Sequence, residues 1–249
     1  MGAGRRGFFL CLTLIAASHL LGGCEAADPE SWADPSGCAV QLAPADGILL
    51  VLEELGPPVL GALDLATGQT STVFSVPSGG FAYEFDARPE GVVLAYTAPA
   101  AEGEAGYDRS TLVLLADGAL TPLLGDANPG DWAFHPKWSA DGAAIWFVRS
   151  GEATAARSVL TRLDLAKRRS IDVVDDATEP AVSPDGAHLA WVAVDPVTAT
   201  RTLVLADADG GSPRIVADAA EIGDLGLPFF SADGRWLYFT VLLATVPEP

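Results

Sequence analysis

The sequence predicts an all-β protein, a β-propeller built from four-stranded antiparallel blades. Three observations lead to this prediction. A turn motif recurs along the chain, short apolar runs alternate with turn residues between its copies, and no long stretch has helical periodicity. A repeat of about 40 to 50 residues suits a blade of four strands, so the repeat decides the architecture.

The recurring turn occurs in three clear copies and two weaker ones. The clear copies are HPKWSADGAAIWFV from His135, EPAVSPDGAHLAWV from Glu179 and LPFFSADGRWLYFT from Leu227, and the weaker ones are QLAPADGILLVLE from Gln41 and DARPEGVVLAYT from Asp86. Their aligned glycines lie 44 to 51 residues apart, at Gly47, Gly91, Gly142, Gly186 and Gly234. Ser-Pro-Asp-Gly is a tight-turn sequence because serine and proline suit its first two positions and glycine the one with positive φ.

The unit around Gly186 shows how one blade is expected to form. A short strand over residues 180–182 enters the turn, and a longer apolar strand follows over residues 188–194. A third strand over residues 200–206, a turn, and a fourth strand over residues 213–217 complete the blade. On this pattern the chain contains four complete blades and a fifth that stops after its second strand.

Large aromatic residues fall at matching places in the repeats. Trp138 precedes the first turn of its unit, and Trp146, Trp191 and Trp236 follow theirs. A blade needs its neighbour to bury its faces, so these rings are expected to fill the space between blades.

The strings PxWS(A/P)DG and LADADGGSPRIVAD resemble the repeats of TolB-like propellers, from about Gln41 to the end of the chain. The resemblance implies a periplasmic or surface propeller that binds other proteins or small ligands through its faces. TolB-like rings usually have six blades, whereas about four and a half are counted here. We expect a truncated gene product to explain the gap, and the alternatives are a complementary partner chain or self-association through the unpaired edge strand. TolB's partners are not transferred, because its separate N-terminal domain has no counterpart here.

The first residues predict an exported lipoprotein. Arg5 and Arg6 precede an apolar run, and Leu21-Gly22-Gly23 before Cys24 resembles the lipobox of bacterial lipoproteins. The predicted division is a signal peptide over residues 1–23, an acidic flexible tether over residues 24–38, and the propeller over residues 39–249, incomplete at its C-terminus. The alternative is an ordinary signal cut near Cys24, which would permit a Cys24–Cys38 disulfide. Export by general secretion ranks above the twin-arginine route.

Charge and motifs limit the function classes. The formal net charge of −19 disfavours nucleic acid and anionic lipid heads as partners. No GxSxG, Walker A or HExxH string occurs, and no catalytic residue, metal site or cofactor is predicted. His135 and Asp131 are the candidates for binding a ligand in the central channel, because His135 precedes an inner strand. His188 is expected to be exposed.

The leading hypothesis is a non-enzymatic scaffold at the cell envelope, anchored by lipid on Cys24, that binds an envelope protein or a small ligand. The first alternative is an enzyme or carbohydrate-binding propeller with its site in the central channel. The second is a truncated, non-functional fragment. An inward-facing cluster of carboxylates and histidines would favour the first alternative.

Overall fold

The computed structural model describes residues 41–43, 48–53, 59–64, 67–75, 81–88, 90–99, 107–116, 119–124, 132–151, 154 and 157–242. These residues form five antiparallel sheets in chain order, four of four strands and one of two strands. The prediction of four blades and a half is therefore confirmed, and we call the sheets blades 1 to 5.

The first two blades occupy the N-terminal half of the described chain. Blade 1 contains β1 (Gln41–Ala43), β2 (Ile48–Glu53), β3 (Val59–Asp64) and β4 (Thr70–Ser75). Blade 2 contains β5 (Phe81–Arg88), β6 (Gly91–Pro99), β7 (Tyr107–Ala116) and β8 (Ala119–Pro122).

The remaining blades complete the described chain. Blade 3 contains β9 (Trp132–Trp138), β10 (Ala144–Ser150), β11 (Val159–Asp164) and β12 (Arg169–Asp175). Blade 4 contains β13 (Ala177–Val182), β14 (His188–Val194), β15 (Arg201–Asp207) and β16 (Arg214–Asp218). After the short helix α1 (Ala219–Ile222), blade 5 contains only β17 (Asp224–Phe230) and β18 (Leu237–Leu242).

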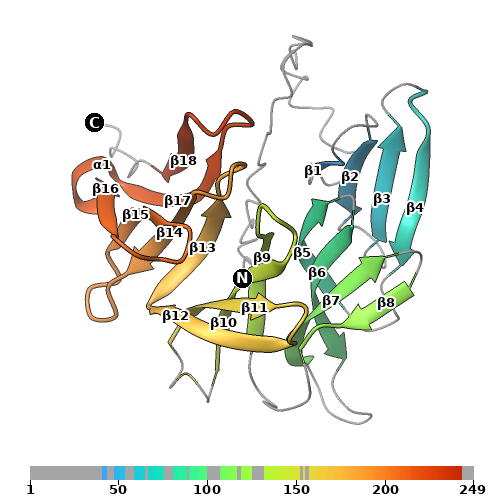
Figure 1. The fold of residues 1–249 in the computed structure, drawn as a ribbon, viewed down its shortest axis with the longest axis horizontal. Coiled ribbons are helices and arrows are strands. Elements are labelled where there is room, and N and C mark those ends of the chain that lie inside the picture. The colour runs from blue at the N-terminus through green and yellow to red at the C-terminus, as the bar shows by residue number, and fades with distance from the viewer. Residues whose placement is uncertain are drawn as a thin grey trace, which may run out of the picture.

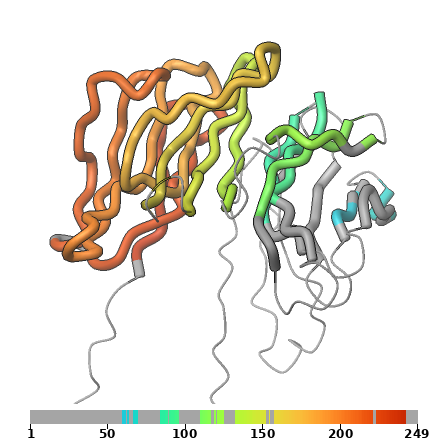
Figure 2. Tube along the Cα trace, turned by 90° about the horizontal axis from the view of Figure 1, so that it is seen from below, coloured from blue at the N-terminus to red at the C-terminus, as the bar shows by residue number. Residues whose placement is uncertain are grey.

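The blades stand side by side in an open arc. Figure 1 shows blade 1 at one end and blade 5 at the other, with the fourth strands β4, β8, β12 and β16 toward the outside. In Figure 2 the colours cross the molecule in chain order, so each blade lies next to its sequence neighbours. The first strands of successive blades contact one another: β1 with β5, β5 with β9, β9 with β13, and β13 with β17. These inner strands therefore line the centre of the arc.

In blades 3, 4 and 5 the turn after the inner strand forms for the reason that its sequence predicts. In blade 4, Ser183 Oγ donates to Asp185 Oδ1 at 2.6 Å and accepts from the backbone N–H of His188 at 2.9 Å. Gly186 has a φ of 70°, in the left-handed region that glycine adopts without a steric penalty. Blades 3 and 5 repeat this geometry, which explains why the motif is the clearest signal in the sequence.

The core lies between the blades. Trp146 and Leu160 of blade 3 pack against Leu189 and Trp191 of blade 4 in one buried cluster. The exposed fractions of Trp138, Trp146 and Trp191 are 5%, 2% and 3%, which confirms that these rings are core. Trp236 is different, because 60% of its surface is exposed. The expectation that Trp236 is buried was wrong: no described blade follows blade 5 to cover it.

Candidate inner-strand site

One position of the repeat brings polar side chains together along the inner strands. Seven residues before the turn glycine, blades 2 to 5 carry Glu84, His135, Glu179 and Leu227. These residues lie on β5, β9, β13 and β17, which contact one another in that order. Two carboxylates and an imidazole therefore occupy matching positions on adjacent inner strands.

Glu84 and His135 join blades 2 and 3. Glu84 Oε1 lies 2.8 Å from His135 Nδ1, and Glu84 Oε2 accepts the backbone N–H of His135. A carboxylate at this distance requires Nδ1 to be the donor, which leaves Nε2 as the acceptor in a neutral imidazole. No hydrogen bond joins Nε2 to another described residue. About a quarter of each side chain is exposed, at 24% for His135 and 28% for Glu84.

Glu179 joins blades 4 and 5 in a related way. Its carboxylate accepts the backbone N–H of Leu227 and forms an ion pair with Arg201. Arg201 Nε also lies 3.7 Å from Asp224 Oδ1 at the start of β17. Charge-assisted hydrogen bonds of this kind are stronger than neutral ones, so Glu179 fixes the position of the half-blade against blade 4.

The backbone at this position explains how the N–H groups reach the preceding blade. His135, Glu179 and Leu227 have φ values of 53°, 51° and 50°, and each precedes a proline. The pairing of their strands shifts register at the same place. A left-handed residue without glycine's freedom is costly, and the bulge turns its N–H out of the sheet ladder. For His135 and Leu227, a glutamate of the preceding blade offsets that cost.

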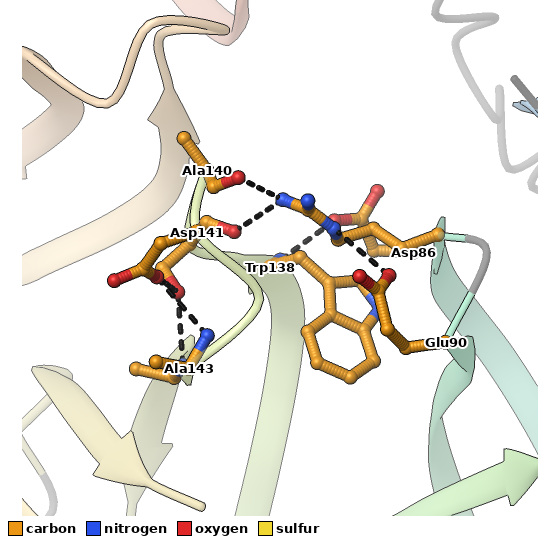
Figure 3. A network of polar contacts seen from close by, with 9 residues as sticks. Asp86, Glu90, Trp138, Ala140, Asp141 and Ala143 are labelled. Atoms are coloured by element: carbon orange, nitrogen blue, oxygen red, sulfur yellow. Dashed lines mark hydrogen bonds and ion pairs between the residues drawn. The ribbon is translucent and has the colours of Figure 1, made fainter.

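A second group of contacts between blades 2 and 3 has a structural role (Figure 3). The buried Asp86 accepts the backbone N–H of Trp138 at 2.7 Å. Arg88 donates to the carbonyl oxygens of Ser139 and Ala140 in the turn of blade 3, and it also pairs with Glu90. These groups satisfy each other, and we assign them to blade packing.

The acidic stretch of residues 172–179 does not form a free cation site. Asp172 pairs with Arg149, and Asp175 and Asp176 pair with Arg157. The hydrogen bond from Arg157 is the main cause that lowers the pKa of Asp176 below its ordinary value. Among the described residues, no group of three or more histidine, cysteine, aspartate or glutamate side chains could hold a metal ion.

Two hollows lie between the outer parts of neighbouring blades. The larger, about 380 Å³, is lined by Trp146, Arg162, Ile171, Val173, Ala208 and Asp209. The smaller, about 130 Å³, is lined mainly by leucines of blades 2 and 3. Neither contains a histidine, and their apolar walls belong to the packing between blades. The inner-strand position is therefore the better candidate site.

The candidate residues of the sequence have different outcomes. His135 lies on an inner strand beside a carboxylate, whereas Asp131, Cys24 and residues 1–38 lie outside the described residues. His188 is exposed, as expected. Sequence reasoning did not single out Glu84 or Glu179 as candidate site residues. Counting seven residues back from each turn glycine would have found both. Within the described residues, no helix has the length and apolar character needed to span a membrane.

Solved structures of other proteins share this arrangement of blades. TolB from Acinetobacter baumannii matches with a TM-score of 0.58 at 17% identity, over 77% of this chain and 45% of that one. A putative TolB from Agrobacterium tumefaciens matches with a TM-score of 0.57 at 16% identity, over 82% of this chain and 73% of that one. The fold is that of a TolB-like β-propeller.

The same propeller architecture occurs in enzymes. An oligogalacturonate lyase from Vibrio parahaemolyticus matches this TolB-like chain with a TM-score of 0.52 at 13% identity, over 74% of this chain and 52% of that one. This chain thus spans about half the length of the Acinetobacter TolB and of the Vibrio lyase. No model of a known protein family matches it, and no curated protein does. Sequence identities this low show a shared fold alone, so the function has to be inferred from the candidate site.

Proposed function

We propose that the chain is a non-enzymatic propeller scaffold of the cell envelope that binds a protein or a small ligand at the inner-strand position. The observation that supports this proposal most is the polar character of that position. Glu84, His135 and Glu179 are partly exposed on adjacent inner strands, where a closed apolar packing would leave nothing for a ligand to recognise. Two of the three also hold blades together, so the site is rigid before binding.

The proposed address is the cell envelope, with export directed by residues 1–23 and a lipid on Cys24. Cys24→Ser is expected to move the protein from the membrane fraction to the soluble fraction, because the acylated thiol would be lost. Mass spectrometry of the N-terminus measures the same step directly. An N-terminus downstream of Cys24 without lipid would contradict the anchor and leave the binding proposal standing.

Capture of a partner from solubilised membranes tests the binding site. The native protein is expected to recover a specific partner, and His135→Ala is expected to lose most of it because the imidazole is removed from the inner strand. His188→Ala is the matched control, since His188 is exposed at the start of β14. If both variants captured the partner equally, the binding site would lie elsewhere. If the native protein captured no specific partner, the scaffold proposal would be contradicted.

One observation supports a second candidate, an enzyme or carbohydrate-binding propeller with its site in the channel. Glu84 orients His135 through Nδ1, and a histidine oriented in this way can act as a general base through Nε2. This reading predicts turnover of a small substrate that is lost in both His135→Ala and Glu84→Gln. Ligand binding that persists with no turnover would favour the scaffold instead.

A further inference from the structure

The larger of the two hollows lies where blade 3 faces blade 4. The register of blade 3 puts Trp146 opposite Arg162 and Arg162 opposite Ile171, so these side chains form one row on a single face of the sheet. The turn between β15 and β16, with Ala208 and Asp209, forms the opposite wall. The volume of about 380 Å³ lies within the range of roughly 300–1,000 Å³ that small-molecule sites occupy.

The repeat shows that Arg162 is unusual at its place. It lies two residues before the end of the third strand of its blade, where blades 1, 2 and 4 have Ala62, Leu114 and Leu205. Leu114 lines the hollow between blades 2 and 3, whose volume is only about 130 Å³. A charged side chain thus stands where its counterparts are apolar, and the hollow beside it is the larger one. A departure of this kind from the local pattern is typical of a functional position.

A closer approach of the two blades cannot remove this hollow. The turn of blade 4 already touches β12, because a Cβ on Gly210 would lie 2.9 Å from Val173 Cγ1. Gly210 has a φ of 84°, which glycine adopts without a steric penalty. This contact holds the two walls apart beside it. Ile171 is 49% exposed, so solvent reaches the hollow from the surface.

Arg162 and Asp209 put opposite charges on the two walls. Arg162 is half-buried, and among the described residues no hydrogen bond or ion pair reaches its guanidinium. The nearby carboxylates of Asp141 and Asp164 are hydrogen-bonded within their own turns instead. Asp209 is exposed, and its Oδ1 accepts the backbone N–H of Gly211 at 2.9 Å. Each wall therefore offers one charged group to a ligand.

These groups define the chemistry of the ligand. A half-buried guanidinium loses part of its hydration, and a carboxylate that accepts two of its N–H groups compensates for that loss. An ammonium suits Asp209 in the same way, and the side chains of Trp146, Ile171 and Val173 suit an apolar body. We propose that the hollow between blades 3 and 4 binds a small zwitterion with an apolar body, such as an apolar dipeptide, through Arg162 and Asp209. This site is separate from the inner-strand site and does not depend on the function proposed there.

Isothermal titration calorimetry with the dipeptide leucyl-phenylalanine tests the proposal on the full chain in detergent. Saturable binding of one dipeptide per chain is expected. The C-terminal amide of the dipeptide lacks the carboxylate and is expected to bind about tenfold more weakly or worse, because the paired contact with Arg162 is lost. The N-acetyl form lacks the ammonium and is expected to bind about threefold more weakly, since the charge of Asp209 is screened by solvent. No binding of the dipeptide, or equal binding of either modified form, would overturn the proposal.

Two substitutions test the charged groups separately. Arg162→Leu introduces the residue that blades 2 and 4 carry at this place, so the fold should persist, as circular dichroism would verify. It is expected to weaken binding of the dipeptide about tenfold and to leave binding of the amide unchanged, because the amide makes no use of the guanidinium. Asp209→Asn keeps an oxygen for the N–H of Gly211. It is expected to weaken the dipeptide and not the N-acetyl form, and the reverse pattern in either variant would overturn the proposal.

Further variants control for charge and for location. Arg168→Leu is the matched control, because Arg168 lines the smaller hollow between blades 2 and 3 and its loss changes the net charge equally. Ala208→Phe is expected to fill the larger hollow and to abolish binding. Arg168→Leu and His135→Ala should both bind the dipeptide like the native protein. A loss in Arg168→Leu would indicate an effect of net charge, a loss in His135→Ala would place the ligand at the inner-strand site, and either would overturn the proposal.

Discussion

Individual serine and aspartate side chains stabilise the turns of the repeat. In blades 3, 4 and 5 a serine hydroxyl donates to the aspartate two residues later, and the same hydroxyl accepts a backbone N–H three residues beyond that aspartate. The surroundings differ, because Ser183 is 1% exposed and Ser231 lies in the open half-blade. The same contact should therefore contribute differently in the two places.

Ser183→Ala is expected to lower the free energy of unfolding by about 1–2 kcal/mol, because it removes a buried hydroxyl and leaves the His188 N–H and the Asp185 carboxylate without their partner. Ser231→Ala removes the same contacts where water can replace them, and about 0.5 kcal/mol or less is expected. Urea denaturation of both variants measures the difference. Equal losses would show that burial does not set the strength of the turn.

Acid should weaken the protein through the same turns. The serine hydrogen bond is the main cause that lowers the pKa of Asp141, Asp185 and Asp233 below the ordinary value of 3.8. A carboxyl whose folded-state pKa is depressed contributes stability above its unfolded pKa, and the contribution is lost as pH falls through the folded value. The free energy of unfolding should thus fall from about pH 5 to about pH 2. Replacing all three aspartates by asparagine should flatten the fall, and an unchanged slope would contradict this cause.

At the scale of elements, side chains of one blade hold the turn or bulge of the next. Glu84 and Glu179 accept backbone N–H groups across two junctions, and Arg88 donates to two carbonyl oxygens in the turn of blade 3. At the corresponding inner-strand place, blade 3 has His135, which cannot supply a carboxylate to blade 4. The apolar cluster around Trp146 and Trp191 joins those two blades instead.

Arg88→Ala is expected to lower the free energy of unfolding by about 1–3 kcal/mol, because two turn carbonyls lose charged donors. Arg168→Ala is the control, since Arg168 lies exposed in the turn between β11 and β12. Thermal denaturation followed by circular dichroism measures both. If Arg168→Ala lowered the free energy of unfolding as much as Arg88→Ala, the loss of a positive charge would be the cause, and not the loss of the two hydrogen bonds to the turn.

The sequence predicts the elements better than the site. The turn glycines and the apolar runs after them predict the blades, because turn chemistry and strand alternation are local properties. The partnership of Glu84 with His135 depends on two residues 51 positions apart meeting across a junction. Only the bulge at His135, with its left-handed backbone, brings that N–H to the carboxylate. The exposure of Trp236 likewise depends on what stands beyond blade 5, which no local pattern specifies.

At the scale of the whole molecule, the main contacts of the described blades are with their neighbours along the arc. Stability in such an array is close to a sum of blade terms and junction terms. Blades 2 to 4 have described neighbours on both sides, whereas blade 5 has two strands and one junction. The free energy of local opening should therefore fall toward β18.

Hydrogen exchange should reveal that gradient. Amides of β17 and β18 are expected to exchange at least tenfold faster than amides of β10 and β14, which lie in the middle of two junctions. Mass spectrometry of peptides after timed exchange measures the rates segment by segment. If all five sheets were equally protected, stability would not be a sum of blade and junction terms, and the blades would unfold as one cooperative unit.

The hydrogen bonds that Glu84 and Glu179 accept from the next blade also affect how such an array can change its number of blades. Glu84 and Glu179 lie in one blade and their N–H donors in the next, so the contact crosses the boundary of the repeat. A duplication that copies one whole repeat reproduces acceptor and donor together and leaves every junction satisfied. A truncation that ends after an acceptor leaves a partly exposed carboxylate without its partner. Gain or loss of whole units is thus tolerated at the level of hydrogen bonds, whereas a truncation is tolerated best at junctions, such as that of blades 3 and 4, that are held by apolar side chains.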